Sequence, residues 1–245
     1  MAALYSETDL AALYDAWWPR GERNDFDFYL PLVMSAEAVL DAGCGTGALL
    51  HEARQSGHRG RLCGLDPGAG MLALARKRRD IEWVLGELAS IDWTREFDLV
   101  VMTGHAFQAL VEDDEIRKSL AAIRLALRDN GRFAFETRNP LERAWEGWTP
   151  EHAVEVPGME GEAVTITTHV DTPFDGRIVS FTHTFTSPIW HQPRRSRSTL
   201  RFLDADMLSS FLASAGFAIE EQFGDWDRHP RIDTSPEIIS IARPR

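Results

Sequence analysis

Residues 41–47 read Asp41-Ala-Gly-Cys-Gly-Thr-Gly47 and join a short apolar run at 38–41 to a segment of helical periodicity at 48–54. An apolar run that ends in an acid and a glycine cluster, and is followed at once by a helix, is typical of a strand, a tight turn and a helix. Glycine lets the backbone approach a ligand without a Cβ, and the start of a helix presents free N–H groups. The stretch therefore predicts a ligand site at this turn.

The same unit recurs along the first half of the chain. Further strands are expected at residues 62–66, 81–85, 97–102 and 131–136, with helices at 71–79 and 114–127 and a turn at 129–130. Two amphipathic stretches, at 9–16 and 24–33, precede them as helices. Alternating strands and helices predict a parallel sheet with right-handed crossovers.

The second half of the chain has a different amino-acid pattern, which is typical of antiparallel strands. Residues 164–170 and 178–186 are rich in Thr, Val, Ile and Phe and predict a hairpin turning at 173–176, with another strand at 194–202. A helix at 204–215 and strands at 217–223 and 238–242 close the chain.

We therefore expect an α/β fold with a doubly wound, mostly parallel seven-stranded sheet. An antiparallel β lid is inserted between strand five and the last helix. The expected parts are a helical arm at 1–34 that covers the cofactor, a core at 35–139 and 203–245, and the substrate lid at 140–202.

Composition narrows the function. The 245 residues hold 26 Lys and Arg against 38 Asp and Glu, a net charge of −12, which disfavours a nucleic-acid partner because such binding neutralises phosphates. No apolar run is long enough for a bilayer, and the first residues lack a signal-peptide pattern. The two cysteines and the absence of Cys/His spacing predict a cytoplasmic protein with no metal site.

Asp66 stands at the end of the second expected strand, 19 residues after Gly47. A carboxylate there is placed to accept hydrogen bonds from both hydroxyls of a ribose. The alternative is that Asp66 caps the following helix. The glycines fall as GxGxG after an acid, whereas the dinucleotide fingerprint is GxGxxG and leaves room for a pyrophosphate.

This pattern resembles the class I methyltransferases that use S-adenosylmethionine (SAM). The resemblance rests on Asp41, Gly43, Gly45 and Gly47, on Asp66, on Gly86-Glu-Leu88, and on residues 97–108 and 127–135. It covers residues 35–137 and the last strand pair, and it is specific for the cofactor rather than for the substrate. It implies SAM as cofactor, S-adenosylhomocysteine (SAH) as product, and the Rossmann-like core described above.

By this resemblance, Asp66 would bind the ribose, Glu87 and Leu88 would lie at the adenine, and the glycine loop would carry the methionine. The backbone at Thr103 and Gly104 would meet the methionine amine, and Tyr14 and Trp18 resemble an element that covers SAM. The full expected cofactor set is Tyr14, Trp18, Asp41, Gly43, Cys44, Gly45, Gly47, Asp66, Glu87, Leu88, Thr103 and Gly104. Family members usually have Asp where this chain has Glu87, which puts the adenine contact of this side chain in doubt, and the alternative is a solvated turn acid. Tyr14 and Trp18 are equally readable as core aromatics.

Methyl transfer is an in-line displacement, so positioning can supply much of the catalysis. The candidate bases are His105, after the fourth strand, His183, on the lid, and Glu136, at the end of strand five. Each has the alternative of a buried, hydrogen-bonded structural group. Phe107, Trp145, Trp148 and Trp190 are candidate pocket walls or core residues.

Arg138 is a candidate for binding an acidic substrate group, as are Arg194, Arg195, Arg197 and Arg201. A solvated strand face is the plainer interpretation of that basic run.

The sequence thus favours a SAM-dependent methyltransferase that acts on an N, O or C nucleophile of a small molecule. The rival hypotheses are an NAD-dependent oxidoreductase, for which Leu49 and Leu50 stand where a third glycine is needed, and a SAM-binding protein without turnover. A homodimer is left open.

Overall fold

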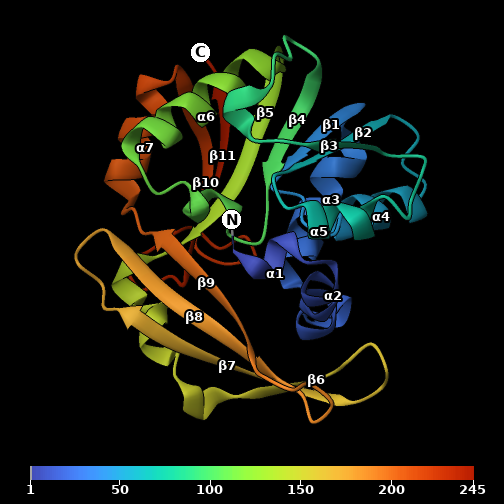
Figure 1. Cartoon of the computed structure of the whole chain (residues 1–245). Coiled ribbons are helices and arrows are strands. Elements are labelled where there is room, and N and C mark those ends of the chain that lie inside the picture. The colour runs from blue at the N-terminus through green and yellow to red at the C-terminus, as the bar shows by residue number, and fades with distance from the viewer. Residues whose placement is uncertain (1) are drawn as a thin grey trace.

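The computed structural model describes residues 2–245, which form a seven-stranded sheet and a separate four-stranded sheet (Figure 1). The strands of the larger sheet are β1 (Ala38–Ala42), β2 (Arg61–Asp66), β3 (Glu82–Leu85), β4 (Phe97–Met102), β5 (Leu127–Arg138), β10 (Phe217–Phe223) and β11 (Glu237–Pro244). They lie in the order β10-β11-β5-β4-β1-β2-β3, and all neighbours are parallel except β11, which is antiparallel to both β5 and β10. The predicted α/β fold class is confirmed.

Helices cover both faces of this sheet, as a doubly wound fold requires. They are α3 (Asn24–Ser35), α4 (Ala48–Gln55), α5 (Ala69–Ala75), α6 (Asp113–Ala126) and α7 (Ala205–Ser214). Leu120 of α6 and Leu208 of α7 belong to the core on one face, and Phe28 of α3 and Leu50 of α4 to the core on the other. Because both faces are covered, all five residues of β1 are buried.

The order of the strands reverses at β1, which pairs with β2 on one side and with β4 on the other. In open α/β sheets, ligands bind outside the carboxyl ends of the strands at such a switch point. The glycine loop follows β1, and Thr103 and Gly104 follow β4. The topology therefore brings the two predicted cofactor segments to the same crevice.

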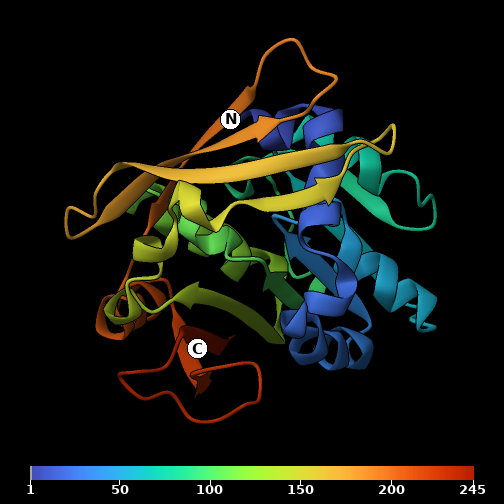
Figure 2. The same cartoon turned by 90° about the horizontal axis from the view of Figure 1, so that it is seen from below.

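The smaller sheet is the lid predicted for the inserted segment. Its antiparallel strands are β6 (Val154–Pro157), β7 (Ala163–Thr172), β8 (Ile178–Thr186) and β9 (Arg194–Arg201). Two arm helices, α1 (Ala3–Ser6) and α2 (Thr8–Trp17), lie between this sheet and the core (Figures 1 and 2). Leu4, Leu10 and Leu13 of the arm pack against Val164 and Phe185 of the lid.

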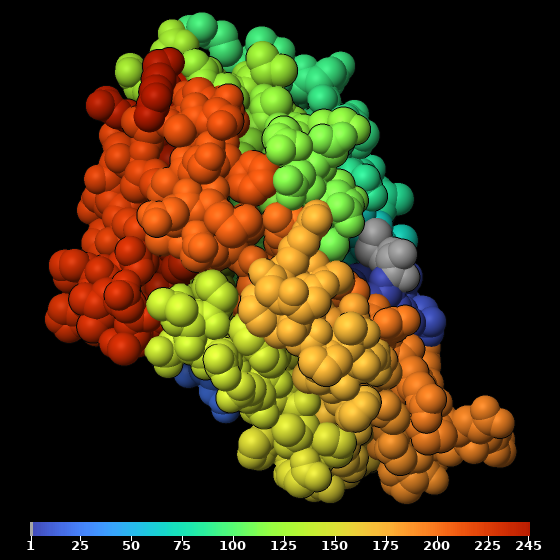
Figure 3. All heavy atoms as spheres, turned by 90° about the vertical axis from the view of Figure 1, so that its left-hand side faces the viewer, coloured from blue at the N-terminus to red at the C-terminus, as the bar shows by residue number. Residues whose placement is uncertain are grey.

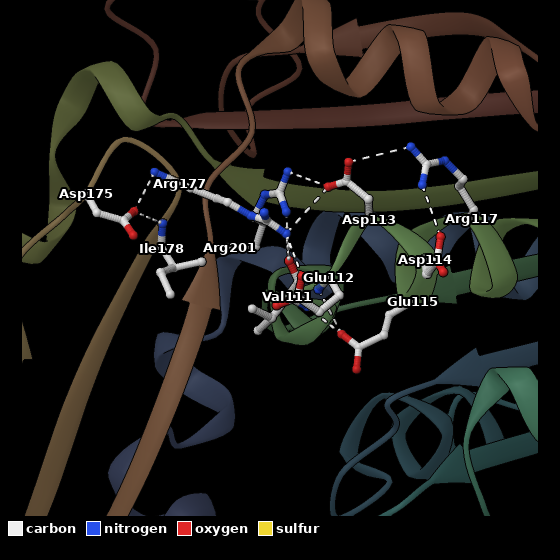
Figure 4. A network of polar contacts seen from close by, with 10 residues as sticks. All are labelled: Val111, Glu112, Asp113, Asp114, Glu115, Arg117, Asp175, Arg177, Ile178 and Arg201. Carbon is white, nitrogen blue, oxygen red and sulfur yellow. Dashed lines mark hydrogen bonds and ion pairs between the residues drawn. The ribbon is translucent and has the colours of Figure 1, made fainter.

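The lid forms a lobe beneath the core and the C-terminal strands (Figure 3). A group of ion pairs fastens it to the start of α6 (Figure 4). Arg201, at the end of β9, is 4 % exposed and donates to the carbonyl of Val111 at 2.7 Å and to Asp113 at 2.9 Å. Arg177 adds an exposed ion pair to Glu112. The lid is thus fixed to the core at the end of β9.

Several local predictions were wrong in detail. The helix expected at 71–79 ends at Ala75, and β6 was not foreseen. The turn expected at 129–130 lies inside β5, where the register with β4 shifts between Phe97 and Leu99. Short single-turn 3-10 helices were also missed, at Arg20–Glu22, Leu88–Ser90, Ala106–Ala109, Pro140–Glu142, Ala144–Gly147 and Pro150–His152. Within residues 2–245, none of the helices combines the length and the apolar character that crossing a bilayer requires.

Candidate active site

The glycine loop leaves β1 at Gly43 and enters α4 at Ala48. Gly43, Gly45 and Gly47 all have positive φ, of 82°, 54° and 77°. A Cβ on Gly43 would lie 2.7 Å from Cβ of Ala106, so a larger residue would displace the segment that follows β4. The absence of a side chain at Gly43 therefore lets the loops after β1 and β4 approach each other closely at the switch point.

Asp66, at the end of β2, fixes the loop from the other side. Its Oδ2 accepts the N–H of Gly45 at 2.8 Å and its Oδ1 accepts the N–H of Gly68 at 2.6 Å. Burial raises the pKa of this carboxyl, while the two backbone bonds act in the opposite direction. Gly68 is the N-cap residue of α5, so Asp66 accepts a hydrogen bond from the start of that helix. A carboxylate with one donor on each oxygen keeps further lone pairs, which could accept hydrogen bonds from hydroxyl groups.

Asp41 is only 1 % exposed, and its Oδ1 has no hydrogen-bond partner within residues 2–245. Burial, together with the nearby charge of Asp66, raises its pKa to about 8. A buried polar atom without a partner is costly, and the cost is removed when a donor is supplied. An ammonium group is such a donor, so this oxygen fits the amine of SAM, and the residues present are compatible with that cofactor.

The loop after β4 is held by a buried acid. Gly104 and His105 both have positive φ, of 64° and 62°, and the His105 N–H donates to Oε1 of Glu136 at 2.6 Å. The hydroxyl of Tyr29 donates to Oε2 of the same carboxyl at 2.5 Å. Glu136 is 0 % exposed with both oxygens engaged, and burial raises its pKa to about 7. Its geometry is that of a residue that positions the His105 backbone.

The arm supplies two further polar groups to this loop. The position that a Cβ on Gly104 would take lies 3.6 Å from Oη of Tyr14 and 3.7 Å from Nη2 of Arg23. Arg23 uses Nε and Nη2 to hold the carboxylate of Asp25 in two parallel hydrogen bonds. Sequence reasoning missed Arg23, because an arginine just before a helix carries no motif.

His105 and Glu237 form a buried pair. Nε2 of His105 lies 3.0 Å from Oε1 of Glu237, the first residue of β11. Burial, and then the charge of Arg138, lowers the pKa of His105 to about 3, and burial raises that of Glu237 to about 7. His105 is therefore neutral at pH 7, and its Nδ1 makes no hydrogen bond within residues 2–245. Glu237 was also missed, since an acid at the start of a final strand gives no signal.

His183 lies on the lid among aromatic rings. Its Nδ1 is 2.9 Å from Oγ1 of Thr168. Its ring packs edge-on against the rings of Trp17 and Phe181, with ring centroids 4.8 Å and 5.0 Å away. Burial lowers its pKa to about 4. The imidazole is thus neutral at pH 7 and contacts the arm helix α2.

The predicted wall residues have separate surroundings. Phe107 is buried in the core against Phe135 at 4.6 Å. Trp145 packs between Phe174 and Phe202 at the base of the lid, whereas Trp190 packs beside the arm. Trp148, the fourth of these residues, lies 5.5 Å from the guanidinium of Arg138.

The remaining cofactor candidates differ in exposure. Glu87 is exposed and caps the short helix at Leu88–Ser90, which is the arrangement of a solvated turn acid. Leu88, Cys44 and Thr103 are buried. Trp18 is 44 % exposed at the end of α2, so the arm aromatic that contacts the lid is Trp17.

The arm lies directly over the Asp66 turn. A Cβ on Gly68 would be 2.6 Å from the carbonyl oxygen of Tyr5. One surface hollow, of about 500 Å³, is lined by Thr46 of the glycine loop, Ala48 at the start of α4 and His51. Another, of about 760 Å³, lies at the amino end of β1, beside Arg61. Neither is lined by the acids described above.

Comparison with known proteins gives a consistent result. Residues 39–131 match a family model described as a methyltransferase domain. Over 117 residues the chain is 31 % identical to malonyl-(acyl-carrier protein) O-methyltransferase of Hahella chejuensis. The matched region covers 44 % of this chain and 41 % of that protein. The chain spans about half the length, or less, of the curated relatives that it matches.

Two solved structures share the whole fold. The CcbJ methyltransferase of Streptomyces caelestis superimposes with a TM-score of 0.76 at 21 % identity, over 98 % of this chain and 97 % of that one. An amino pentose methyltransferase of Micromonospora echinaspora gives a TM-score of 0.69 at 22 % identity, over 96 % of this chain and 97 % of that one. Residues 39–131 are therefore similar to a methyltransferase domain, and the chain has the fold of these two methyltransferases of known structure.

Proposed function

We propose that this protein is a SAM-dependent methyltransferase that transfers a methyl group to an N, O or C nucleophile of a small molecule. The observation that carries the proposal is the unpartnered Oδ1 of Asp41, beside a glycine loop that Asp66 holds in place. A buried carboxyl oxygen with no donor is expected where a ligand brings one. The matched family model and the named relatives support the same cofactor.

Asp66 would bind the ribose hydroxyls, and Asp41 would accept a hydrogen bond from the methionine amine. Arg23 would bind the methionine carboxylate, because its guanidinium is the cationic group nearest to Gly104 and its Nη1 makes no hydrogen bond within residues 2–245. Tyr14 would cover the same segment. When bound, SAM supplies an electrophilic methyl group on a sulfonium.

The acceptor would lie between the ends of β4 and β5 and the inner face of the lid. There, His105 is the base that the contacts favour, since Glu237 engages Nε2 and leaves the Nδ1 lone pair free. Because burial holds the pKa of His105 at about 3 in the free protein, the charge of ionised Glu237 would have to stabilise the imidazolium that forms. The arm and the lid would exclude water from the transfer. Glu136 would act by holding the His105 backbone, and His183 stays a second candidate base.

A small-molecule acceptor, rather than nucleic acid, agrees with the net charge of −12. Location in the cytoplasm and a homodimer remain predictions from the sequence.

The proposal is tested by titration calorimetry with SAM, SAH and NAD, on the wild type and on Asp66→Ala. We expect micromolar binding of SAM and SAH, lost in the variant, and no binding of NAD. NAD binding without SAM binding would favour an oxidoreductase. SAM binding without methyl transfer to any member of an acceptor panel would favour a binding protein without turnover.

A further inference from the structure

Arg138, the last residue of β5, is partly buried and has few partners for its charge. Its Nη1 donates to Oε1 of Gln108 at 3.1 Å. No carboxylate of residues 2–245 lies within 4.0 Å of its guanidinium, although Glu237 of β11 is its cross-strand neighbour, and neither its Nε nor its Nη2 has a hydrogen-bond partner there. Burial is the main reason that its pKa is lowered. An arginine nevertheless stays charged in proteins, so a partly buried positive charge lies here without an ion-pair partner.

The other arginines of the lid segment are different. Arg194 pairs with Glu7 and Asp9 of the arm. Arg197 pairs with Asp171, and Arg201 pairs with Asp113 as Figure 4 shows. Arg195 is exposed to solvent. An unpaired charge that is partly buried costs more than a paired or fully solvated one, so Arg138 stands out among these arginines as a group available to a ligand.

The unpaired edge of Arg138 has a specific shape. Its Nε and Nη2 are the same two atoms with which Arg23 holds the carboxylate of Asp25. These two N–H groups point in parallel and match the two oxygens of a carboxylate or of a phosphate. The free edge of Arg138 is therefore complementary to an anion with two equivalent oxygens.

Neighbouring groups favour the same kind of ligand. The hydroxyl of Tyr14 makes no hydrogen bond within residues 2–245, and the Arg138 charge opposes the burial that raises its pKa. Trp148 lies 5.5 Å from the guanidinium and packs on Phe181 of the lid at 4.8 Å. The nearby acid, Glu237, is engaged by His105. A cation and an aromatic wall thus meet at the end of β5, next to the Tyr14 hydroxyl that faces the cofactor loop at Gly104.

We propose that Arg138 binds an anionic group, a carboxylate or a phosphate, carried by the methyl acceptor. This inference rests on the proposed methyltransferase function. It assigns the acceptor to the class of small acids. In this assignment, Arg23 binds the carboxylate of the cofactor and Arg138 binds the anionic group of the acceptor.

The test uses the full chain saturated with SAH and three fluorinated probes followed by fluorine NMR: para-fluorobenzoate, para-fluorophenyl phosphate and the neutral para-fluorobenzamide. We expect at least one anion to bind about tenfold more tightly than the amide. Comparison of benzoate with phenyl phosphate then tells which anion the site prefers. Arg138→Gln should remove the preference, and Arg138→Lys should keep only part of it, because an ammonium cannot make the two parallel bonds.

The matched control is Arg195→Gln, which removes the same charge from an exposed position and should leave all three affinities unchanged. The melting temperature of each variant, measured alongside, checks that it is folded. The proposal is overturned if acid and amide bind equally, if no anion binds, if the preference survives in Arg138→Gln, or if that variant loses affinity for SAH instead. If the wild type does not bind SAH, that result counts against the proposed function alone. The anion preference of Arg138 can still be measured, because the three probes can be titrated into the protein without SAH.

Discussion

The two halves of the crevice are built in different ways. On the cofactor side, Asp41, the glycine loop and Asp66 lie within one short stretch, and backbone N–H groups make most of the contacts. On the acceptor side, the Tyr29–Glu136 bond joins residues 107 apart in sequence, and the His105–Glu237 bond joins residues 132 apart. The first half depends on a local motif, and the second on how distant segments meet. A substitution should therefore act locally in the first half and across several elements in the second.

The largest effect is expected at His105. Replacing it with Asn, which tolerates a positive φ, should lower the rate of methyl transfer by about 10²- to 10⁴-fold because the base is lost. SAH affinity should stay close to that of the wild type. Glu237→Gln should reduce kcat by about tenfold and change the pH profile, because only the orientation of the imidazole is disturbed. Single-turnover rates with an acceptor found by screening would measure this, and an unchanged rate in His105→Asn would exclude His105 as the base.

The next effect concerns Glu136 and separates a positioning role from a catalytic one. Glu136→Ala leaves two buried donors, the Tyr29 hydroxyl and the His105 N–H, without an acceptor, and should lower the free energy of unfolding by about 3 kcal/mol. Glu136→Gln should be far milder, because the amide oxygen can accept from His105 and the Tyr29 hydroxyl can turn to accept from the amide nitrogen. Urea denaturation gives both values. A well-folded Glu136→Gln variant that binds SAH and has no activity would instead make Glu136 the base.

Asp41 should give the cofactor side a pH dependence. Its pKa of about 8 in the free protein means that it is largely protonated at pH 7. An ammonium ligand favours the ionised form, so this group should weaken SAH binding as pH falls below 8, by up to about tenfold per pH unit. Calorimetry between pH 6 and 9 on the wild type and on Asp41→Asn isolates the effect, because titration of the ligand's own amine is common to both. Parallel pH profiles for the two proteins would show that Asp41 does not meet the amine.

The smallest effects are expected where the lid is fastened to α6. Arg201→Met removes the hydrogen bonds of a buried guanidinium to Asp113 and to the Val111 carbonyl, which keeps Arg177 as a donor at 3.2 Å, and should cost about 1–3 kcal/mol of unfolding free energy. Arg177→Met removes an exposed ion pair and should cost less than about 1 kcal/mol. Thermal unfolding in low and high salt would compare them. Equal losses would mean that burial does not set the strength of this attachment.

Much of the fold was predictable because its signals are local. The run at 38–41, the glycines and the helix at 48–54 give β1, the loop and α4. The hairpin at 164–186 appears as β7 and β8, since β-branched and aromatic residues mark strands without reference to distant partners. The overlong helix at 71–79 shows the limit: residues 76–79 are strongly helix-forming, yet the chain leaves α5 at Ala75 to enter β3.

The acceptor side was predictable in part. His105 and Glu136 were selected by their places at strand ends and Arg138 by its charge, but their roles depend on contacts that sequence spacing does not indicate. Glu136 is engaged by Tyr29 and by the His105 backbone, and Arg138 is left without an acid. Arg23 and Glu237 were missed because their proposed roles depend on their tertiary neighbours, Gly104 and His105, which the local sequence does not indicate.

By itself, the sequence determined the order of strands and helices, the glycine loop and the position of Asp66, because backbone conformation and burial are set by neighbouring residues and their periodicity. The tertiary structure alone decided which carboxyl groups are engaged, which histidine nitrogen is free, and which arginine lacks a counter-ion. These properties depend on desolvation and on partners brought together by packing, and both arise only when segments more than 100 residues apart meet at one edge of the sheet.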